Sequence, residues 1–220
     1  MLKYKKSVCP NGNDCVAKRC TENIRIKWWQ HRKIISENGV SIKMKKIGII
    51  GAMELEVETL KSKMNVAKTT KKANMEFFEG TLNGVEVVIV RSGIGKVNAG
   101  ICTQILADIF DVTHIINTGI AGSLDAQIDI GDIVVSTDVL QHDMDVRVFG
   151  YPLGEIPQLG TLSFPADDRM SSLAKSVCEK VNEGVKVFSG RIVSGDQFIC
   201  DKEVKDRLVE NFHPLCTEME

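Results

Sequence analysis

Three glutamates follow a short apolar run at a point in the chain where a carboxylate could do acid–base chemistry. Residues 46–58 read KIGIIGAMELEVE, and the isoleucine-rich run at 47–50 is typical of a strand buried on both faces of a parallel sheet. The run ends at Gly51 and passes at once into an expected helix. Such an arrangement opens a crevice at the carboxyl end of the strand, where α/β sheets bind ligands.

The acids in this turn argue against a phosphate site. A helix N-terminus that cradles phosphate is lined with glycine, serine or basic side chains, whereas Glu54, Glu56 and Glu58 repel anions. Early acids also offset the helix dipole, and this structural role suits Glu54 and Glu58. We predict that Glu56 faces the crevice and carries the chemistry.

Further strand-end loops supply the rest of a candidate site. They are SGIG at 92–95, TGIAGS at 118–123, SGDQFI at 194–199 and the closing EME at 218–220. Small residues in such loops let a ligand approach the backbone closely. The sequence contains no P-loop and no Ser-His-Asp order, and GIGKVN is a poor dinucleotide fingerprint because Asn98 occupies the third glycine position.

The histidines do not form a metal-binding pattern. His31, His114, His142 and His213 lie far apart, and the acids beside His142 have no second His/Cys cluster to complete a site. A structural role for His142 is the simpler interpretation. We therefore expect neither a metal nor a cofactor.

Composition indicates an ordinary globular protein. The 220 residues are 43% hydrophobic and 26% charged, with a formal net charge of −1, which excludes a global charge attraction to nucleic acid or anionic membranes. No apolar run reaches membrane-spanning length. The cysteines after residue 43 are scattered, as free thiols in a reducing compartment would be, so we expect a cytoplasmic protein; they are Cys102, Cys178, Cys200 and Cys216.

Residues 1–43 differ from the rest of the chain. They carry ten Lys and Arg against three acids, three cysteines in a C-x5-C-x4-C spacing, and Trp28 beside Trp29. A zinc site with His31 or a small nucleic-acid-binding arm would each explain part of this, but the spacing fits no standard zinc pattern. We interpret 1–43 as a basic, poorly ordered extension before a genuine start at Met44, and 44–220 as the folded domain.

The order of apolar runs predicts an α/β fold around a mixed sheet. Expected strands after the first cover 75–81, 85–90, 114–118, 131–137, 185–193 and 215–220, and expected helices cover 54–64, 97–109, 168–181 and 201–211. Asn83 and Gly84 predict a hairpin turn, whereas 68–74 (KTTKKAN) reads as a polar join. The Gly- and Pro-containing stretch 141–165 predicts a functional or interface loop.

Eight motifs, in order, carry a resemblance to a known family. IGIIGAMELEV, SGIGKVNA, INTGIAGS, GDIVVS, HDMDV, VFGY, SGDQFI and EME resemble the 5′-methylthioadenosine/S-adenosylhomocysteine nucleosidases of the nucleoside phosphorylase superfamily. The match runs from Met44 to Glu220. It implies a three-layer sandwich with a central mixed, twisted sheet flanked by helices, and a homodimer that hydrolyses the N-glycosidic bond of these nucleosides to release adenine without a cofactor.

The resemblance also implies roles for individual residues. Glu56 matches the glutamate that activates water, and Glu220 the one that binds the ribose hydroxyls. Ile120 occupies a position where many relatives have serine, which removes one hydrogen bond to water or ribose. The other implied substrate-binding residues are Gly122 near the ribose, Met219 against it, Phe198 and Ile199 at adenine, and Met53 and Ile94 at the site wall. Those implied to cover the thioalkyl group of the neighbouring subunit are Val146, Phe149, Tyr151 and Pro157.

The same resemblance implies a segment that this sequence does not contain. The family continues past EME through a helix, a strand with the aspartate that protonates adenine, and a final helix. We therefore expect an incomplete fold at the C-terminus and slow turnover, since a lost general acid costs about 10²–10⁴-fold. Two alternatives stay open, a purine nucleoside phosphorylase of the same superfamily and a truncated, non-catalytic product that pairs or competes with a full-length partner.

Overall fold

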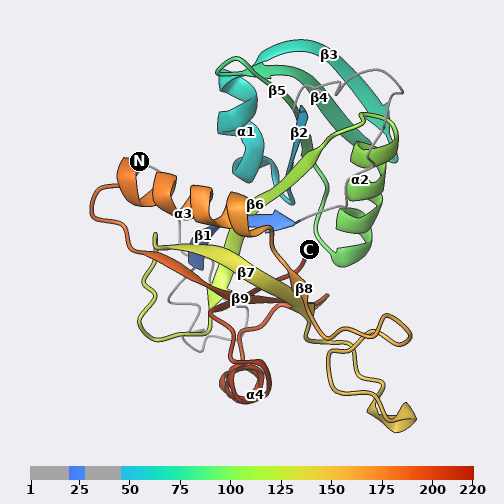
Figure 1. Cartoon of the computed structure of the whole chain (residues 1–220), viewed down its shortest axis with the longest axis vertical. Coiled ribbons are helices and arrows are strands. Elements are labelled where there is room, and N and C mark those ends of the chain that lie inside the picture. The colour runs from blue at the N-terminus through green and yellow to red at the C-terminus, as the bar shows by residue number, and fades with distance from the viewer. Residues whose placement is uncertain (1–19, 28–45) are drawn as a thin grey trace, which may run out of the picture.

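One mixed sheet of ten strands organises the part of the chain that the computed structural model describes, residues 20–27 and 46–220 (Figure 1). The strand order is β1-β7-β9-β10-β6-β2-β5-β4-β3, with β8 paired to β7. The strands are β1 (Cys20–Lys27), β2 (Lys46–Gly51), β3 (Asn65–Lys72), β4 (Met75–Leu82), β5 (Val85–Arg91), β6 (His114–Ser123), β7 (Ile133–Gln141), β8 (Phe164–Pro165), β9 (Val187–Ser194) and β10 (Cys216–Glu218).

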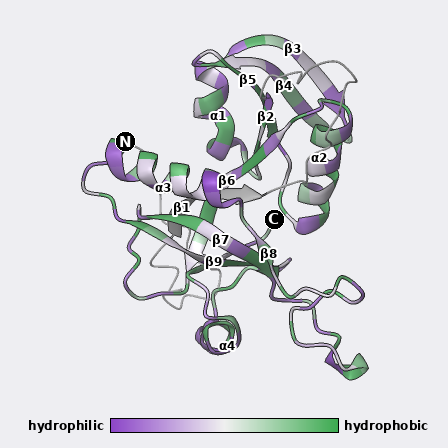
Figure 2. Cartoon of the chain, in the orientation of Figure 1, coloured by the Kyte–Doolittle hydropathy of each residue, from purple (hydrophilic) through white to green (hydrophobic). Residues whose placement is uncertain are grey.

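Helices cover both faces of this sheet, as the predicted three-layer architecture requires. They are α1 (Glu54–Lys63), α2 (Lys96–Asp108), α3 (Asp168–Val181) and α4 (Lys202–Phe212), with a short 3₁₀ helix η1 (Arg147–Phe149). Ile49 of β2 packs towards α1, whereas its neighbour Ile50 packs towards α2, since side chains alternate along a strand. In Figure 2 the helices alternate between the two colours, as expected of helices with one buried and one exposed face.

The other half of the sheet is packed in the same way. Ile133 and Val135 of β7 contact α3, and Leu140 of the same strand contacts α4 together with Val193 of β9. Figure 1 shows α3 and α4 on opposite sides of β7 and β9. The buried apolar side chains of β2, β5, β6, β7 and β9 thus form a core on each side of the sheet, which supports the strand ends where the loops emerge.

The strand β1 closes part of the sheet on itself. It pairs antiparallel with β6, from Cys20 opposite Gly122 to Lys27 opposite Ile115, and parallel with β7. Because β7 also pairs with β9, β9 with β10 and β10 with β6, these strands and β1 form a closed ring. The rest of the expected N-terminal extension lies outside the described residues, so the division of the chain at Met44 stays a prediction.

Most predicted elements are confirmed, and two details differ. Residues 65–72 form the strand β3, so the prediction of a polar join at 68–74 is wrong; β3 is mostly exposed and lies at the sheet edge. Helix α2 forms as predicted, but the apolar stripe that its helical period predicts, Val97, Ile101, Ile105 and Ile109, does not supply the buried face, because only Ile105 of these packs against the core. Ala99, Cys102 and Leu106 are buried, whereas the stripe residues Val97, Ile101 and Ile109 are exposed.

Candidate functional site

The carboxylate of Glu56 is held by two main-chain N–H groups. Glu56 lies in the first turn of α1, and its Oε2 accepts the N–H of Met53, the N-cap residue, at 2.8 Å. This contact is one half of a capping box. Its Oε1 accepts the N–H of Ile120 in β6 at 2.9 Å. The second contact reaches a different strand, so it turns the half-buried carboxylate towards the end of the sheet.

Gly119 leaves the space that this carboxylate occupies. A Cβ atom at Gly119 would lie 2.6 Å from Oε1 of Glu56, closer than real Cβ contacts allow. A side chain at residue 119 would therefore displace the carboxylate from this position. The small-residue segment at 118–123, which the sequence predicts as a loop, is instead the carboxyl-terminal part of the strand β6, and this part of the strand faces Glu56.

Main-chain hydrogen bonds bring the first predicted loops together. The N–H of Ser92, after β5, donates to the carbonyl of Gly51 at 2.9 Å, and the N–H of Gly93 donates to that of Ala52 at 3.1 Å. Both acceptors precede α1 directly. Because β2 pairs in parallel with β5 and β6, the loops at 51–56, 92–95 and 118–123 emerge at the same end of the sheet.

The remaining two loops join the same end. Gly195, in the loop after β9, donates its N–H to the carbonyl of Glu218 in β10 at 3.1 Å. Asp196 Oδ1 accepts the N–H of Lys96, the first residue of α2, at 2.8 Å. These contacts tie the 194–199 loop to the closing EME on one side and to the SGIG loop on the other. All five predicted loops therefore meet.

The residues predicted to bind adenine have different surroundings. The ring of Phe198 is 71% exposed, so it is not a core residue. Ile199 is half-buried and packs on the cluster that joins α4 to β7 and β9, which contains Leu140, Val193, Leu208 and Phe212. Packing of Ile199 therefore anchors one end of this loop, and Phe198 projects from it.

The predicted ribose residues lie at the end of β10. Met219 and Glu220 are half-buried, and the N–H of Glu220 donates to Oε2 of Glu218 at 2.8 Å. Gly122 lies opposite Thr217 across the β6–β10 pair. A Cβ atom at Gly122 would meet Thr217 at an ordinary 3.6 Å, so the contacts of Gly122 within the chain do not demand glycine.

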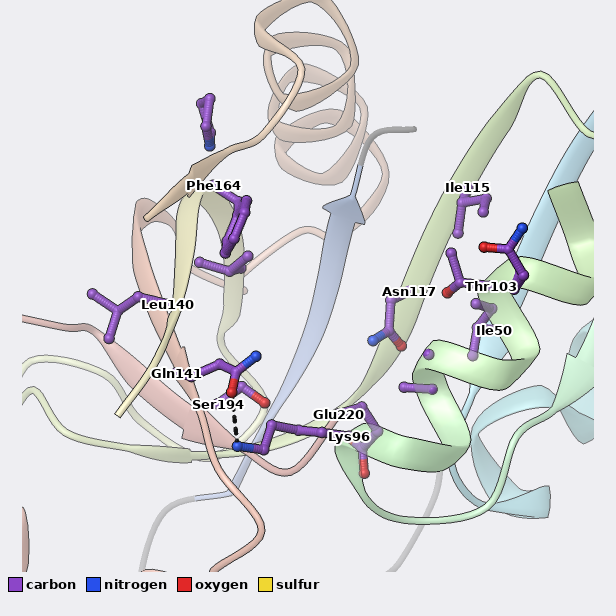
Figure 3. Close-up of a pocket in the computed structure, with 15 residues that line it drawn as sticks. Ile50, Lys96, Thr103, Ile115, Asn117, Leu140, Gln141, Phe164, Ser194 and Glu220 are labelled. Carbon is purple, nitrogen blue, oxygen red and sulfur yellow. Dashed lines mark hydrogen bonds between the residues drawn. The ribbon is translucent and has the colours of Figure 1, made fainter. Parts of the chain in front are cut away.

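A cavity of about 480 Å³ opens beside these residues (Figure 3). Glu220 lines it together with Asn117, which precedes Gly119 by two residues in β6. The other wall comes from β7 and β8, including Leu140 and Phe164. Figure 3 shows Glu220 beside Lys96, between the α2 side and the β7 side of the cavity. The cavity is mostly apolar and lies next to the Glu56 loop, whose own residues do not line it.

The remaining predicted residues are peripheral in the single chain. Met53 is half-buried at the start of α1, and Ile94 is exposed, with its carbonyl accepting the side-chain amide of Asn98 at 2.7 Å. The segment between β7 and β8 projects from the body of the molecule (Figure 1). It carries all of the residues predicted to cover a neighbouring site, Val146, Phe149, Tyr151 and Pro157. Their role across a subunit interface stays a prediction.

Sequence reasoning missed a polar cluster at the loops. Lys96 forms an ion pair with Asp143, and its Nζ also donates to Oε1 of Gln141 at 3.1 Å. Burial by itself would raise the pKa of Asp143, but the hydrogen bonds from Lys96 and from the N–H of Asp196 hold it below the ordinary value. The signal in the sequence was a lysine at a helix start and an acid in HDMDV, which are remote from one another.

His142 has a structural position. It is buried, and its main-chain N–H donates to the carbonyl of Ser194 at 2.9 Å. Burial lowers the pKa of His142. Within residues 20–27 and 46–220, no group of three His, Cys, Asp or Glu side chains is arranged to hold a metal ion. None of the helices in those ranges combines the length and hydropathy needed to cross a bilayer.

Comparison with known proteins agrees with this geometry. The family model described as the phosphorylase superfamily matches residues 46–220. A 5′-methylthioadenosine/S-adenosylhomocysteine nucleosidase from Halalkalibacterium halodurans is 46% identical over 178 residues, covering 80% of this chain and 76% of the relative.

Two crystal structures of nucleosidases with the same name have the same fold. The one from Colwellia psychrerythraea, in complex with adenine, has a TM-score of 0.77 and 43% identity, covering 81% of this chain and 74% of that chain. The one from Neisseria meningitidis, in complex with methylthio-immucillin-A, has a TM-score of 0.77 and 38% identity, covering 80% and 76%. With the matched fold, the ordered motifs and these identities, the chain belongs to the 5′-methylthioadenosine/S-adenosylhomocysteine nucleosidase family of the phosphorylase superfamily.

Proposed function

We propose that this protein hydrolyses the N-glycosidic bond of 5′-methylthioadenosine and S-adenosylhomocysteine, and of 5′-deoxyadenosine, to adenine and the corresponding sugar. The observation that carries the proposal is the position of the Glu56 carboxylate. The N–H of Ile120 holds it, and Gly119, which has no side chain, leaves the space that it occupies. The nucleosidase names of the relatives and the adenine complex of one of them support the choice of substrate.

The chemistry assigned to Glu56 is activation of water. Adenine takes up a proton as it leaves, and a water molecule attacks the remaining oxocarbenium-like sugar on the opposite face. Each Glu56 oxygen accepts one N–H and keeps a further lone pair, so the carboxylate can orient a water molecule and take its proton while it stays in place. The rigid hold matters because a misplaced base loses much of its effect.

The other site residues bind the nucleoside. Phe198 presents an exposed ring face on which adenine can stack, and the main chain of Phe198 and Ile199 offers hydrogen bonds to the edge of the base. Glu220 would bind the ribose hydroxyls and Met219 would lie against the sugar. Met53, Ile94 and Gly122 complete the wall.

Water is a better acceptor than phosphate at this site. A phosphorylase needs arginines on the strand-end loops to bind phosphate. Arg91 is the arginine closest in sequence to the SGIG loop, and its Nε lies 3.8 Å from Oε2 of Glu54, an acid that would repel phosphate. The neighbouring glutamates of the loop add to this repulsion.

The test is adenine release from methylthioadenosine, with and without phosphate. We expect phosphate-independent release by the wild-type chain, and a Glu56→Gln variant that folds normally but turns over about 10²–10⁴-fold more slowly. Glu58→Gln is the matched control, because Glu58 is exposed on the same helix. Release of ribose-1-phosphate would identify a phosphorylase, and a wild-type chain without any release would identify a non-catalytic product.

Assembly as a homodimer is part of the proposal. Several apolar side chains are exposed on α2 and on the segment between β7 and β8, among them Val97, Ile101, Val148 and Phe149. Exposed apolar side chains that gather on one surface mark association sites, and a second copy would place the projecting segment over the neighbouring site. A monomer by light scattering at assay concentration would contradict this.

The proposal also places the protein in the cytoplasm, in methionine salvage and recycling of the methyl cycle. Its nucleoside substrates are by-products of those reactions. Among the described residues, Cys102, Cys178 and Cys200 are free thiols, which suits a reducing compartment. Fractionation of cells followed by immunodetection tests the location.

A further inference from the structure

Lys96 links loops that are distant in sequence. It is the first residue of α2, directly after the SGIG loop that follows β5. Its Nζ donates to Oε1 of Gln141 and forms an ion pair with Asp143, both at the end of β7. Figure 3 shows the Lys96 side chain crossing from α2 to Gln141, close to Ser194 at the end of β9.

Hydrogen bonds join Lys96, Asp143 and Asp196 in a closed circuit. Besides the Lys96–Asp143 ion pair, Oδ2 of Asp143 accepts the N–H of Asp196 at 2.9 Å, and Oδ1 of Asp196 accepts the N–H of Lys96 at 2.8 Å. Each residue therefore contacts the other two. The circuit connects the loops after β5, β7 and β9 without passing through the sheet.

The ion pair in this circuit is more buried than a surface ion pair. The side chains of Lys96 and Asp143 are 19% and 15% exposed. Solvent and salt screen such a pair less than an exposed one, and removal of one partner leaves a charge in a poorly hydrated place. By contrast, both side chains of the Lys175–Glu179 pair on α3 are 40% exposed or more.

The circuit acts on the loop that is assigned to adenine. Asp196 precedes Phe198 by two residues. Gly195, the residue before Asp196, lies against the buried ring of His142. A Cβ atom at Gly195 would come within 2.4 Å of Nε2 of His142. The loop therefore packs on His142 through Gly195 and is hydrogen-bonded to Asp143 and Lys96 through Asp196. The ring of Phe198 stays exposed and can contact a ligand.

We propose that Lys96 and Asp143 are positioning residues, which hold the 196–199 loop through Asp196 in the orientation that receives adenine. The inference rests on the proposed function and adds to it the residues that fix the orientation of the 196–199 loop. Neither side chain is assigned a contact with substrate. Their effect is transmitted through the main chain of Asp196 to Phe198 and Ile199.

Lys96→Met tests this proposal with two readouts. We expect the KM for methylthioadenosine to rise about tenfold to a hundredfold, with a smaller fall in kcat, because the loop is misplaced while Glu56 is untouched. We also expect faster amide hydrogen exchange in peptides that cover 194–200. Lys96→Arg keeps the charge and should recover part of both losses. Lys175→Met is the control, because its ion pair is exposed and remote.

The outcomes separate this inference from the proposed function. Unchanged KM and unchanged exchange in Lys96→Met would overturn the positioning role. Exchange needs no substrate, so the loop can be followed in a wild-type chain that releases no adenine, a result that would overturn only the proposed function. Should Lys96→Met not fold, Asp143→Asn keeps the side-chain volume and gives the same two readouts.

Discussion

Glu56 has a structural role and a proposed chemical role, and its two hydrogen bonds separate them. A glutamate in the first turn of a helix often caps the N-terminus, and the bond from the N–H of Met53 has that ordinary explanation. The bond from Ile120 has no part in capping, because it comes from another strand. The carboxylate is therefore placed by tertiary contacts, which is what a catalytic group needs and a cap does not.

Gly119 offers a test of that placement. An alanine there would put its Cβ 2.6 Å from Oε1 of Glu56, so the carboxylate or the strand must move. We expect Gly119→Ala to lower kcat by about a hundredfold through misplacement of the base, and to cost about 1 kcal/mol of stability, because the flexible carboxylate moves and a hydrogen bond is lost. Rates of adenine release and thermal melts measure the two effects.

Gly100→Ala is the matched control for Gly119→Ala. A Cβ atom at Gly100, in α2, meets nothing within 4 Å, so this variant should melt at the same or a higher temperature, since alanine favours helices by about 1 kcal/mol over glycine. If Gly119→Ala behaved like Gly100→Ala in both assays, the proposed contact between Gly119 and the carboxylate would have no functional weight.

At the scale of the elements, the pattern of apolar runs predicts what is buried and fails where a strand has no buried face. The runs at 47–50, 85–90 and 185–193 became β2, β5 and β9 because both of their faces contact helices or other core residues. Residues 65–72 carry lysines and threonines without alternation, yet they pair with β4 at the edge of the sheet. Exposed, charged edge strands protect sheets from aggregation, but they leave no apolar period to detect.

The polar links between elements could not be predicted for a different reason. The position of Glu56 follows from a local strand–turn–helix pattern. The partnership of Lys96 with Asp143 depends on β5 and β7 ending near one another, which is set by the order of strands in the sheet. A single sequence contains no direct record of that order, so the strand-end segments were predictable and this link between them was not.

Another such link, between β7, β9 and α4, gives an element-scale prediction. Arg191 of β9 donates Nε and Nη2 to the carboxylate of Asp138 in β7, at 3.0 and 2.7 Å, and Nη1 to the carbonyl of Phe212 at 3.0 Å. The Asp138 side chain is only 17% exposed. We expect Asp138→Asn to lower the free energy of unfolding by about 1–3 kcal/mol, because a charged hydrogen-bond partner is lost.

Asp129→Asn provides the comparison for Asp138→Asn. The Asp129–Lys186 pair is 3.3 Å long, and both side chains are more than half exposed, so its loss should cost less than about 1 kcal/mol. Urea unfolding of both variants measures the difference. Equal losses of unfolding free energy would mean that partial burial does not strengthen the Asp138–Arg191 link between β7 and β9.

At the scale of the whole molecule, the site lies where two halves of one sheet meet. Strands β2 and β5 with α1 and α2 form one half, and β7, β9 and β10 with α3 and α4 form the other, with β6 between them. Glu56 belongs to the first half, whereas Phe198 and Glu220 belong to the second. The Lys96–Asp143 pair spans the boundary, so conditions that weaken it should act on fold and site together.

Acidity is such a condition, because protonation of His142 and of nearby carboxylates lowers the stability of the folded protein as the pH falls. Burial lowers the pKa of His142 from its ordinary value of 6.5, with Asp143 opposing and Lys96 adding to the shift. Below pH 6.5 the unfolded chain binds a proton that the folded chain resists, so stability is full above this pH and declines below it. A second decline should follow below 3.8, because the pKa values of Asp138 and Asp143 are also lowered in the folded protein.

A His142→Gln variant isolates the first decline. Glutamine is neutral at every pH, so the variant should lose the fall in Tm that begins near 6.5 and keep the one that begins near 3.8. The comparison uses the slope of Tm against pH, so a constant loss from imperfect packing of glutamine against Gly195 does not affect it. Parallel curves for wild type and variant through the first window would show that His142 does not titrate with unfolding, and the seat of the adenine loop would then be insensitive to mild acid.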